Sequence, residues 1–186
     1  MNAHMVYPLR YLYAVVFIVT ILLDLSCLVV TLLNPDLGDL TGKINRIDHE
    51  DIWSRMDIFS HIVYWVGDLT CHQQPSRSLI IDGGQFPVCI RDTGLVIGTS
   101  IGAAIALFSN IKVSKRLFIM TLILSFLTIA DWIFKSVSGI DIIQLAAVTA
   151  VISGTSAVLF GYCFFTYVQK YLIKRFSGES VVRFFD

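Results

Sequence analysis

Residues 71–102 read CHQQPSRSLIIDGGQFPVCIRDTGLVIGTSIG. The beginning of this stretch combines thiol, imidazole, guanidinium and carboxyl side chains with four residues that exclude a continuous helix: Pro75, Gly83, Gly84 and Pro87. Its end is apolar, with a glycine at every fourth position from Gly94 onward. A reactive segment, 71–94, therefore runs directly into a helix of membrane type, and we expect the functional site at this junction.

The composition outside that stretch is typical of an integral membrane protein. Of the 186 residues, 55% are hydrophobic and only 15% are charged, against about 25% charged in soluble domains. The formal net charge is zero, so the overall charge gives no reason to expect a nucleic-acid partner. The length suits one domain, which we assign to residues 1–186, with the lipid bilayer as its surroundings.

Four apolar runs predict membrane spans, at about 11–33, 94–109, 117–137 and 142–168. The first run has 23 residues and would form a helix of about 35 Å, enough to cross a hydrocarbon core of about 30 Å. It is too long for the apolar part of a signal peptide and lacks a small-residue cleavage pattern, so we interpret it as a retained span. The predicted fold is all-α, a polytopic transmembrane helical bundle of four spans.

Residues 51–70 predict an amphipathic helix at the membrane interface. Apolar residues recur every three or four positions on one face, and Asp57, His61, Tyr64 and Asp68 fall on the opposite face. A fifth span is the alternative, but it would immerse two aspartates and a histidine in the bilayer.

The distribution of basic residues predicts the orientation, because lysine and arginine favour the cytoplasmic side. They occur before the first span, between the second and third, and after the fourth: Arg10, Lys112, Lys115, Arg116, Lys170, Lys174 and Arg175. Segment 34–93 holds nine acidic residues against five basic ones. We therefore expect a plasma-membrane protein with both termini in the cytoplasm and segment 71–94 outside. Lys135 is the exception to this pattern.

Two acids, Asp24 and Asp131, interrupt apolar runs. Each would lie about 20 Å from the inner edge of the bilayer, so both could meet segment 71–94 in one cavity. Ionisable groups at this depth are candidates for function, here as a catalytic base, with Arg91 binding a developing anion. The alternative is a structural acid, hydrogen-bonded to a neighbouring helix.

Four side chains of the segment are competent metal ligands: Cys71, His72, Cys89 and Asp92. Thiolates, an imidazole and a carboxylate together suit zinc or a similar divalent metal, and Cys89-x-x-Asp92 has the spacing of a metal knuckle. A Cys71–Cys89 disulfide and a free or catalytic thiol remain alternatives, because spacing alone does not decide among them.

The segment also offers groups that bind anions. Arg77 and Arg91 are fork-shaped donors, and Ser78, Thr93 and Gly94 add a hydroxyl or backbone N–H near a predicted helix start. A lipid phosphate would suit such a site at the interface. The alternative is that the arginines pair with nearby acids and that Asp92 or Thr93 caps the helix.

In these residues the chain resembles the domain of unknown function 2085 family of small polytopic membrane proteins. The resemblance rests on a Cys-His-Gln, Arg-Ser, Gly, Cys-x-Arg-x-Thr-Gly pattern, matched here by Cys71, His72, Gln73, Pro75, Arg77, Ser78, Gly84, Pro87, Cys89, Arg91, Thr93, Gly94 and Gly98. It implies the fold and the site but no activity. A third cysteine often replaces Asp92 in that family, which implies a Cys/Asp/His variant of a Cys/Cys/His site here.

Three functions fit these features. The first is a metal-binding membrane enzyme that acts at the outer interface on an amphiphilic or lipid-linked substrate. The second is a small transporter or channel component that uses Asp24 and Asp131 as ion or proton sites. The third is a non-catalytic assembly subunit that forms homo- or hetero-oligomers through the glycine-rich faces of the second and fourth spans.

Overall fold

The computed structural model describes residues 7–35, 37, 39–43, 45–109 and 111–177, so both chain ends lie outside the described residues. Four helices in this part of the chain are long and apolar enough to cross a membrane: Leu9–Leu33, Ile90–Phe108, Lys115–Ser138 and Ile143–Leu172. The predicted all-α fold with four spans is therefore confirmed. Three boundaries differ by four residues or more, because the first helix begins at Tyr7, the second at Ile90, and the fourth continues to Ser177.

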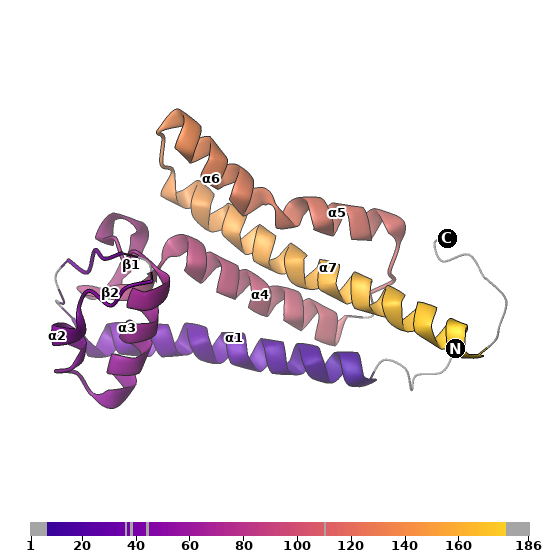
Figure 1. Ribbon diagram of the computed structural model, residues 1–186, viewed down its shortest axis with the longest axis horizontal. Helices are drawn as coiled ribbons and strands as arrows, with labels where there is room; N and C mark the ends of the chain where they lie inside the picture. Colours follow the sequence, from indigo (N-terminus) through magenta and orange to yellow (C-terminus); the bar gives the residue numbers. More distant parts are fainter. Residues whose placement is uncertain (1–6, 36, 38, 44, 110, 178–186) are drawn as a thin grey trace.

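The spanning helices lie side by side, and the reactive segment is gathered at one end of them (Figure 1). Helix α4 (Ile90–Phe108) lies between α1 (Tyr7–Leu33) and α7 (Ile143–Ser177), and the third span packs on α7. The short helices α2 (Glu50–Trp53) and α3 (Ile58–Thr70) and a β-hairpin cover the end where α1 finishes and α4 begins. The connection from α4 to the third span lies at the opposite end.

Helices α4 and α7 pack closely, because glycines remove the side chains between them. A Cβ atom at Gly98 would lie 2.3 Å from the carbonyl oxygen of Val151, and one at Gly154 would lie 2.4 Å from that of Leu95. The hydroxyl of Thr155 donates a hydrogen bond of 3.0 Å to the Gly98 carbonyl oxygen. These glycine faces are thus occupied within the chain, which corrects their interpretation as docking surfaces for another subunit.

The third span is two helices rather than the continuous helix predicted over 117–137. Helix α5 (Lys115–Ser125) ends at Phe126, and α6 (Leu127–Ser138) follows directly. The hydroxyl of Ser153 on α7 accepts a hydrogen bond of 2.9 Å from the backbone N–H of Thr128. The Thr128 hydroxyl in turn donates 3.2 Å to the carbonyl oxygen of Thr149. A side chain of another helix therefore satisfies the backbone at the break, as a kink inside a membrane requires.

The predicted amphipathic helix over 51–70 is also divided. Asp57 caps α3, accepting 3.0 Å hydrogen bonds from the backbone N–H groups of Phe59 and Ser60, so a new helix starts where continuity was expected. The polar face of α3 is buried, with Tyr64 and Asp68 fully inaccessible. Its apolar face is the exposed one, which suits contact with lipid.

Buried Asp68 explains why a polar face turns inward. Its carboxylate accepts hydrogen bonds from the backbone N–H groups of Asp48 and His49, at 3.0 and 3.1 Å, and from Trp53 Nε1 at 2.9 Å. Trp53 stacks on Tyr64 with ring centroids 5.1 Å apart. Asp68 therefore fastens the chain before α2 onto α3, and three donors offset the cost of burying a charge.

The chain after α3 forms a short 3₁₀ helix, Pro75–Arg77, and an antiparallel hairpin that the sequence analysis did not predict. Strands β1 (Ser78–Ile81) and β2 (Gly84–Cys89) are joined by Asp82 and Gly83, both at positive φ, the conformation of a tight two-residue hairpin turn. Gly84 lies so close to α1 that a Cβ atom there would be 2.2 Å from the Thr31 carbonyl oxygen. The hairpin thereby connects α1 to the start of α4.

We predict that Gly98→Ala destabilises the protein by about 1–3 kcal/mol, because the new methyl group would overlap the backbone of α7. Ile97→Ala is the matched control, since Ile97 is 40% exposed on the lipid side of the same helix turn. Thermal unfolding in detergent measures both variants. Equal midpoints for the two would show that α4 and α7 do not pack through Gly98.

Candidate functional site

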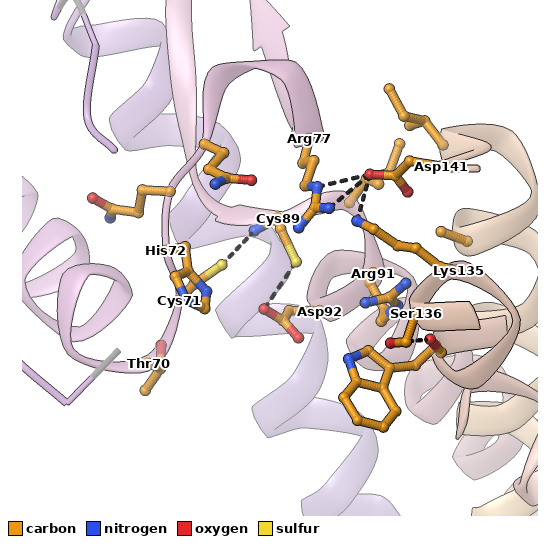
Figure 2. Close-up of a pocket in the computed structure, with 16 residues that line it drawn as sticks. Thr70, Cys71, His72, Arg77, Cys89, Arg91, Asp92, Lys135, Ser136 and Asp141 are labelled. Carbon is orange, nitrogen blue, oxygen red and sulfur yellow. Dashed lines mark hydrogen bonds and ion pairs between the residues drawn. The ribbon is translucent and has the colours of Figure 1, made fainter. Parts of the chain in front are cut away.

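A cavity of about 350 Å³ opens at the hairpin end of the bundle, a volume in the range of small-ligand pockets. Its walls come from the end of α3, the segment after it, the first turn of α4, the end of α6 and the start of α7. Figure 2 shows thiol and carboxyl groups on one side of it and a group of ion pairs on another. We call this the polar cavity.

Three of the four predicted metal ligands come together on a wall of the polar cavity. Ligand atoms of Cys71, Cys89 and Asp92 all lie within 4.8 Å of one another. The Cys89 thiol is 3.1 Å from Asp92 Oδ2, and the Cys89 backbone N–H donates 3.2 Å to the Cys71 sulfur (Figure 2). Both cysteines are free thiols, so the structure does not contain the alternative disulfide. His72 lines the same cavity but is exposed and outside the group.

Local structure accounts for the grouping of these atoms. Cys89 is the N-cap of α4, and Asp92 lies three residues later in the first turn, so the two side chains share one helix face. A carboxylate in the first turn also interacts favourably with the helix dipole. Cys71 arrives from the end of α3, where it is only 4% exposed.

The two thiols differ in proton affinity. A hydrogen bond from Cys89 lowers the pKa of the Cys71 thiol, although burial opposes this shift. The same hydrogen bond, together with burial, raises the pKa of Cys89. Cys71 is therefore the first of the pair to become a thiolate, which is the form that binds metals.

Two buried glutamines hold the segment in place. Gln73 is fully buried in a left-handed backbone conformation, and its side-chain amide donates 2.8 Å to the Pro87 carbonyl oxygen. The Gln85 side chain donates a short hydrogen bond to the Gln73 carbonyl oxygen. The Tyr64 hydroxyl donates 2.8 Å to the Gln85 carbonyl oxygen, and burial raises the pKa of Tyr64 to about 12. Sequence reasoning missed the roles of Gln85 and Tyr64, because their partners are backbone groups distant in sequence.

An ion-pair group forms another wall of the polar cavity. The Asp141 carboxylate pairs with Arg77 at 2.8 Å and with Lys135 at 2.5 Å (Figure 2). Asp141 was not among the predicted site residues, although its position between the third and fourth spans places it at the outer end of the predicted topology. Lys135, the exception to the basic-residue pattern, thus has an acidic partner at the same end of the bundle.

Asp131 joins the site through Arg91. The two side chains pair at 2.9 Å, and that of Asp131 is only 7% exposed. Arg91 Nε is buried without a hydrogen-bond partner among the described residues. Asp131 is therefore placed to hold the guanidinium group at the edge of the polar cavity.

Asp24 does not reach the polar cavity, which corrects the prediction that both intramembrane acids meet the segment in one cavity. It lines a second cavity of about 410 Å³ between α1, α3, β2 and α4, which we call the apolar cavity. The two cavities adjoin, because Asp92 and Thr70 line both. Asp24 belongs to α1 and Asp131 to α6, and helices α4 and α7 lie between these two helices (Figure 1).

The predicted anion-binding residues also lie at different places in the structure. Arg77 and Arg91 line the polar cavity, whereas Thr93 lines the apolar one and donates its hydroxyl to the Cys89 carbonyl oxygen at 3.1 Å. Gly94 packs on α7, where an added Cβ atom would lie 2.9 Å from the Ala150 methyl carbon. Ser78 starts β1 opposite Cys89, and its hydroxyl is buried without a partner among the described residues. The helix N-cap is Cys89, not Asp92 or Thr93.

Four apolar helices and a polar site at their end define a polytopic integral membrane protein. The family described as "Predicted membrane protein (DUF2085)" matches residues 71–170, more than half of the chain, and the protein belongs to this family. The match begins at Cys71 and includes the hairpin and all helices from α4 to most of α7. Searches of curated proteins and of solved structures each found no match.

We predict that Asp131→Asn destabilises the protein more than Asp141→Asn. The first change leaves Arg91 without a counter-charge at a poorly exposed position, which costs about 3 kcal/mol when a buried pair is broken. The second breaks the pairs of Asp141 with Arg77 and Lys135. Because the Arg77 and Asp141 side chains are 37% and 32% exposed, a loss of at most about 1 kcal/mol is expected. Unfolding midpoints in detergent at fixed salt compare the two, and the opposite order would contradict this assignment.

Proposed function

We propose that this protein is a membrane metalloprotein that binds one zinc-like divalent ion with Cys71, Cys89 and Asp92. The observation that carries the proposal is the approach of these three ligand atoms to within 4.8 Å of one another. Two sulfur ligands suit zinc, and a carboxylate oxygen is an accepted third ligand. Both thiols are free, and Cys71 has the lowered pKa that favours a thiolate.

Three protein ligands leave one position of a tetrahedral ion open, which is the pattern of catalytic rather than structural zinc sites. The neighbouring His72 is the candidate for closing that position, and its exposed side chain would then have to turn toward the two sulfur atoms. With water in the open position, the ion would supply a hydroxide near neutral pH. This supports an enzyme that acts at the membrane interface.

In such an enzyme Arg91 would bind an anionic group of the substrate, and Asp131 would position its guanidinium. The ion pair of 2.9 Å supports this assignment over a role for Asp131 as a free base. Asp24 lines the other cavity, where it would contact a different part of the substrate. Asp24 lines the apolar cavity, whereas Asp131 is paired with Arg91 beside the polar one, which argues against a single transport path through both carboxyl groups.

We further propose that the polar cavity faces the outside of the plasma membrane. Arg10, Lys112 and Lys115 belong to the end of the bundle opposite the hairpin, which is the pattern of a cytoplasmic end. The start of α4 would then place Asp92 at the outer edge of the hydrocarbon core.

Protein purified without oxygen should contain one zinc-like ion per chain by elemental analysis. Cys89→Ala should remove that ion because it deletes a ligand, whereas Cys163→Ala should keep it, since Cys163 is buried within the bundle away from the cavity. Folding of both variants is checked by their elution in detergent. A stoichiometric Cys71–Cys89 disulfide without metal in fresh protein would refute the metal site.

Two variants, each with one introduced cysteine, test the orientation. A membrane-impermeant maleimide added to intact cells should label Lys43→Cys and not Lys112→Cys, both positions being exposed. Mapping by mass spectrometry separates the probes from the native cysteines, and permeabilised cells show that both probes can react. Labelling of Lys112→Cys alone in intact cells would show that the protein has the opposite orientation.

A further inference from the structure

We infer that the polar and apolar cavities together form one binding site for a membrane lipid with an anionic headgroup. The lipid chain would occupy the apolar cavity and the headgroup the polar cavity. This inference names the ligand of the proposed metal site and rests on that proposal for the role of the ion. The evidence for the two cavities does not depend on the proposed metal ion.

The apolar cavity is open toward the bilayer. Its walls include Leu23 of α1 together with Ile62 and Val66 of α3, whose side chains are 51%, 54% and 45% exposed. Leu23 lies on a membrane-spanning helix, and Ile62 and Val66 belong to the exposed apolar face of α3. A lipid chain could therefore enter the cavity laterally without crossing water. Its volume of about 410 Å³ lies in the range of ligand-binding cavities.

The apolar cavity also extends along the helices, which is the orientation of a lipid chain in a bilayer. Along α4 its walls run from Asp92, in the first turn of the span, to Val96. Four residues of helix correspond to about 6 Å along the membrane normal for an upright helix. A chain in this cavity would therefore extend from the edge of the membrane into the hydrocarbon core, parallel to the helices.

Charge determines which end of the lipid enters which cavity. The apolar cavity contains the carboxyl groups of Asp24 and Asp92, which offer no counter-charge to an anionic headgroup. In the polar cavity Arg77 and Lys135 share the carboxylate of Asp141, so this ion-pair group carries one positive charge in excess. The remaining acid of that cavity, Asp92, belongs to the wall with the two thiols. An anionic headgroup would complete the ion-pair group with charge-assisted hydrogen bonds.

Because the two cavities adjoin, one ligand can occupy both. Thr70 and Asp92 belong to the walls of both cavities. The linkage between headgroup and chain would therefore pass Asp92, beside Cys71 and Cys89. The bonds of an amphiphilic ligand that join its polar and apolar parts would thus lie next to the proposed ion.

Photocrosslinking tests this site with the full-length protein in phosphatidylcholine nanodiscs. The probe is phosphatidic acid carrying a diazirine near the end of one acyl chain, added in trace amounts. We expect a several-fold excess of crosslinks on the α3 peptide with Ile62 and Val66 over the α6 peptide with Ile129 and Ile133, which are similarly exposed. Unlabelled phosphatidic acid should compete, and the same probe built on phosphatidylcholine should lack the excess.

Variants separate the two halves of the site. Val66→Phe should remove the excess by filling the apolar cavity, whereas Val148→Phe, at an exposed position of α7 outside both cavities, should keep it. Arg77→Gln should raise the competing concentration of phosphatidic acid about tenfold, the loss expected for one charge-assisted hydrogen bond. Elution in detergent verifies that each variant is folded.

The outcomes distinguish this inference from the metal proposal. Protein stripped of metal by a chelator should retain the α3 excess, because Arg77, Lys135 and the walls of the apolar cavity would contact the lipid without the ion. An even spread of crosslinks over α3 and α6 would overturn the lipid site, whatever the metal content of the same sample. An α3 excess that phosphatidylcholine matches and Arg77→Gln leaves unchanged would overturn the anionic headgroup.

Discussion

The close packing of α4 on α7 is the constraint on which the rest of the structure depends. Gly98 and Gly154 bring the two helix backbones into contact, and the Thr155 hydroxyl adds a hydrogen bond across them. Because α4 begins at Ile90, this packing fixes the N-terminal turn that carries Arg91 and Asp92. The start of α7 and the end of α6 lie at the same end of the bundle and supply the opposing wall of the polar cavity.

A second requirement is that irregular chain at a membrane edge must satisfy its own polar groups. Asp68 does this for the chain before α2 by accepting three hydrogen bonds. Gln73, Gln85 and Tyr64 do it for the segment between α3 and α4. These buried side chains explain how Cys71 is held beside Cys89 without a disulfide. The position of Cys71 beside Cys89 therefore depends on hydrogen bonds among α3, the hairpin and the segment between them, and the hairpin packs on α1 and leads into α4.

The sequence predicts well what depends on local pattern. Apolar runs gave the four spans, and the four-residue glycine period gave a close helix contact. Features that depend on distant partners were missed. The break between α5 and α6 requires Ser153 of another helix, and α3 turns its polar face inward because Asp68 binds a loop some 20 residues away. The tight turn at Asp82 and Gly83 could have been found from its Asp-Gly pair. No sequence motif marked Asp141 as a site residue, because it lies in a short connection between two spans.

The most direct test of the central claim, a Cys71–Cys89–Asp92 metal centre, is X-ray absorption spectroscopy at the zinc edge on anaerobically purified protein. Two sulfur ligands at about 2.3 Å and oxygen or nitrogen ligands at about 2.0–2.2 Å are predicted. The same spectrum from Cys89→Ala, reloaded with zinc, should lose sulfur from the coordination shell. A first shell of oxygen and nitrogen alone in the native protein, with both thiols reduced, would contradict the proposed centre.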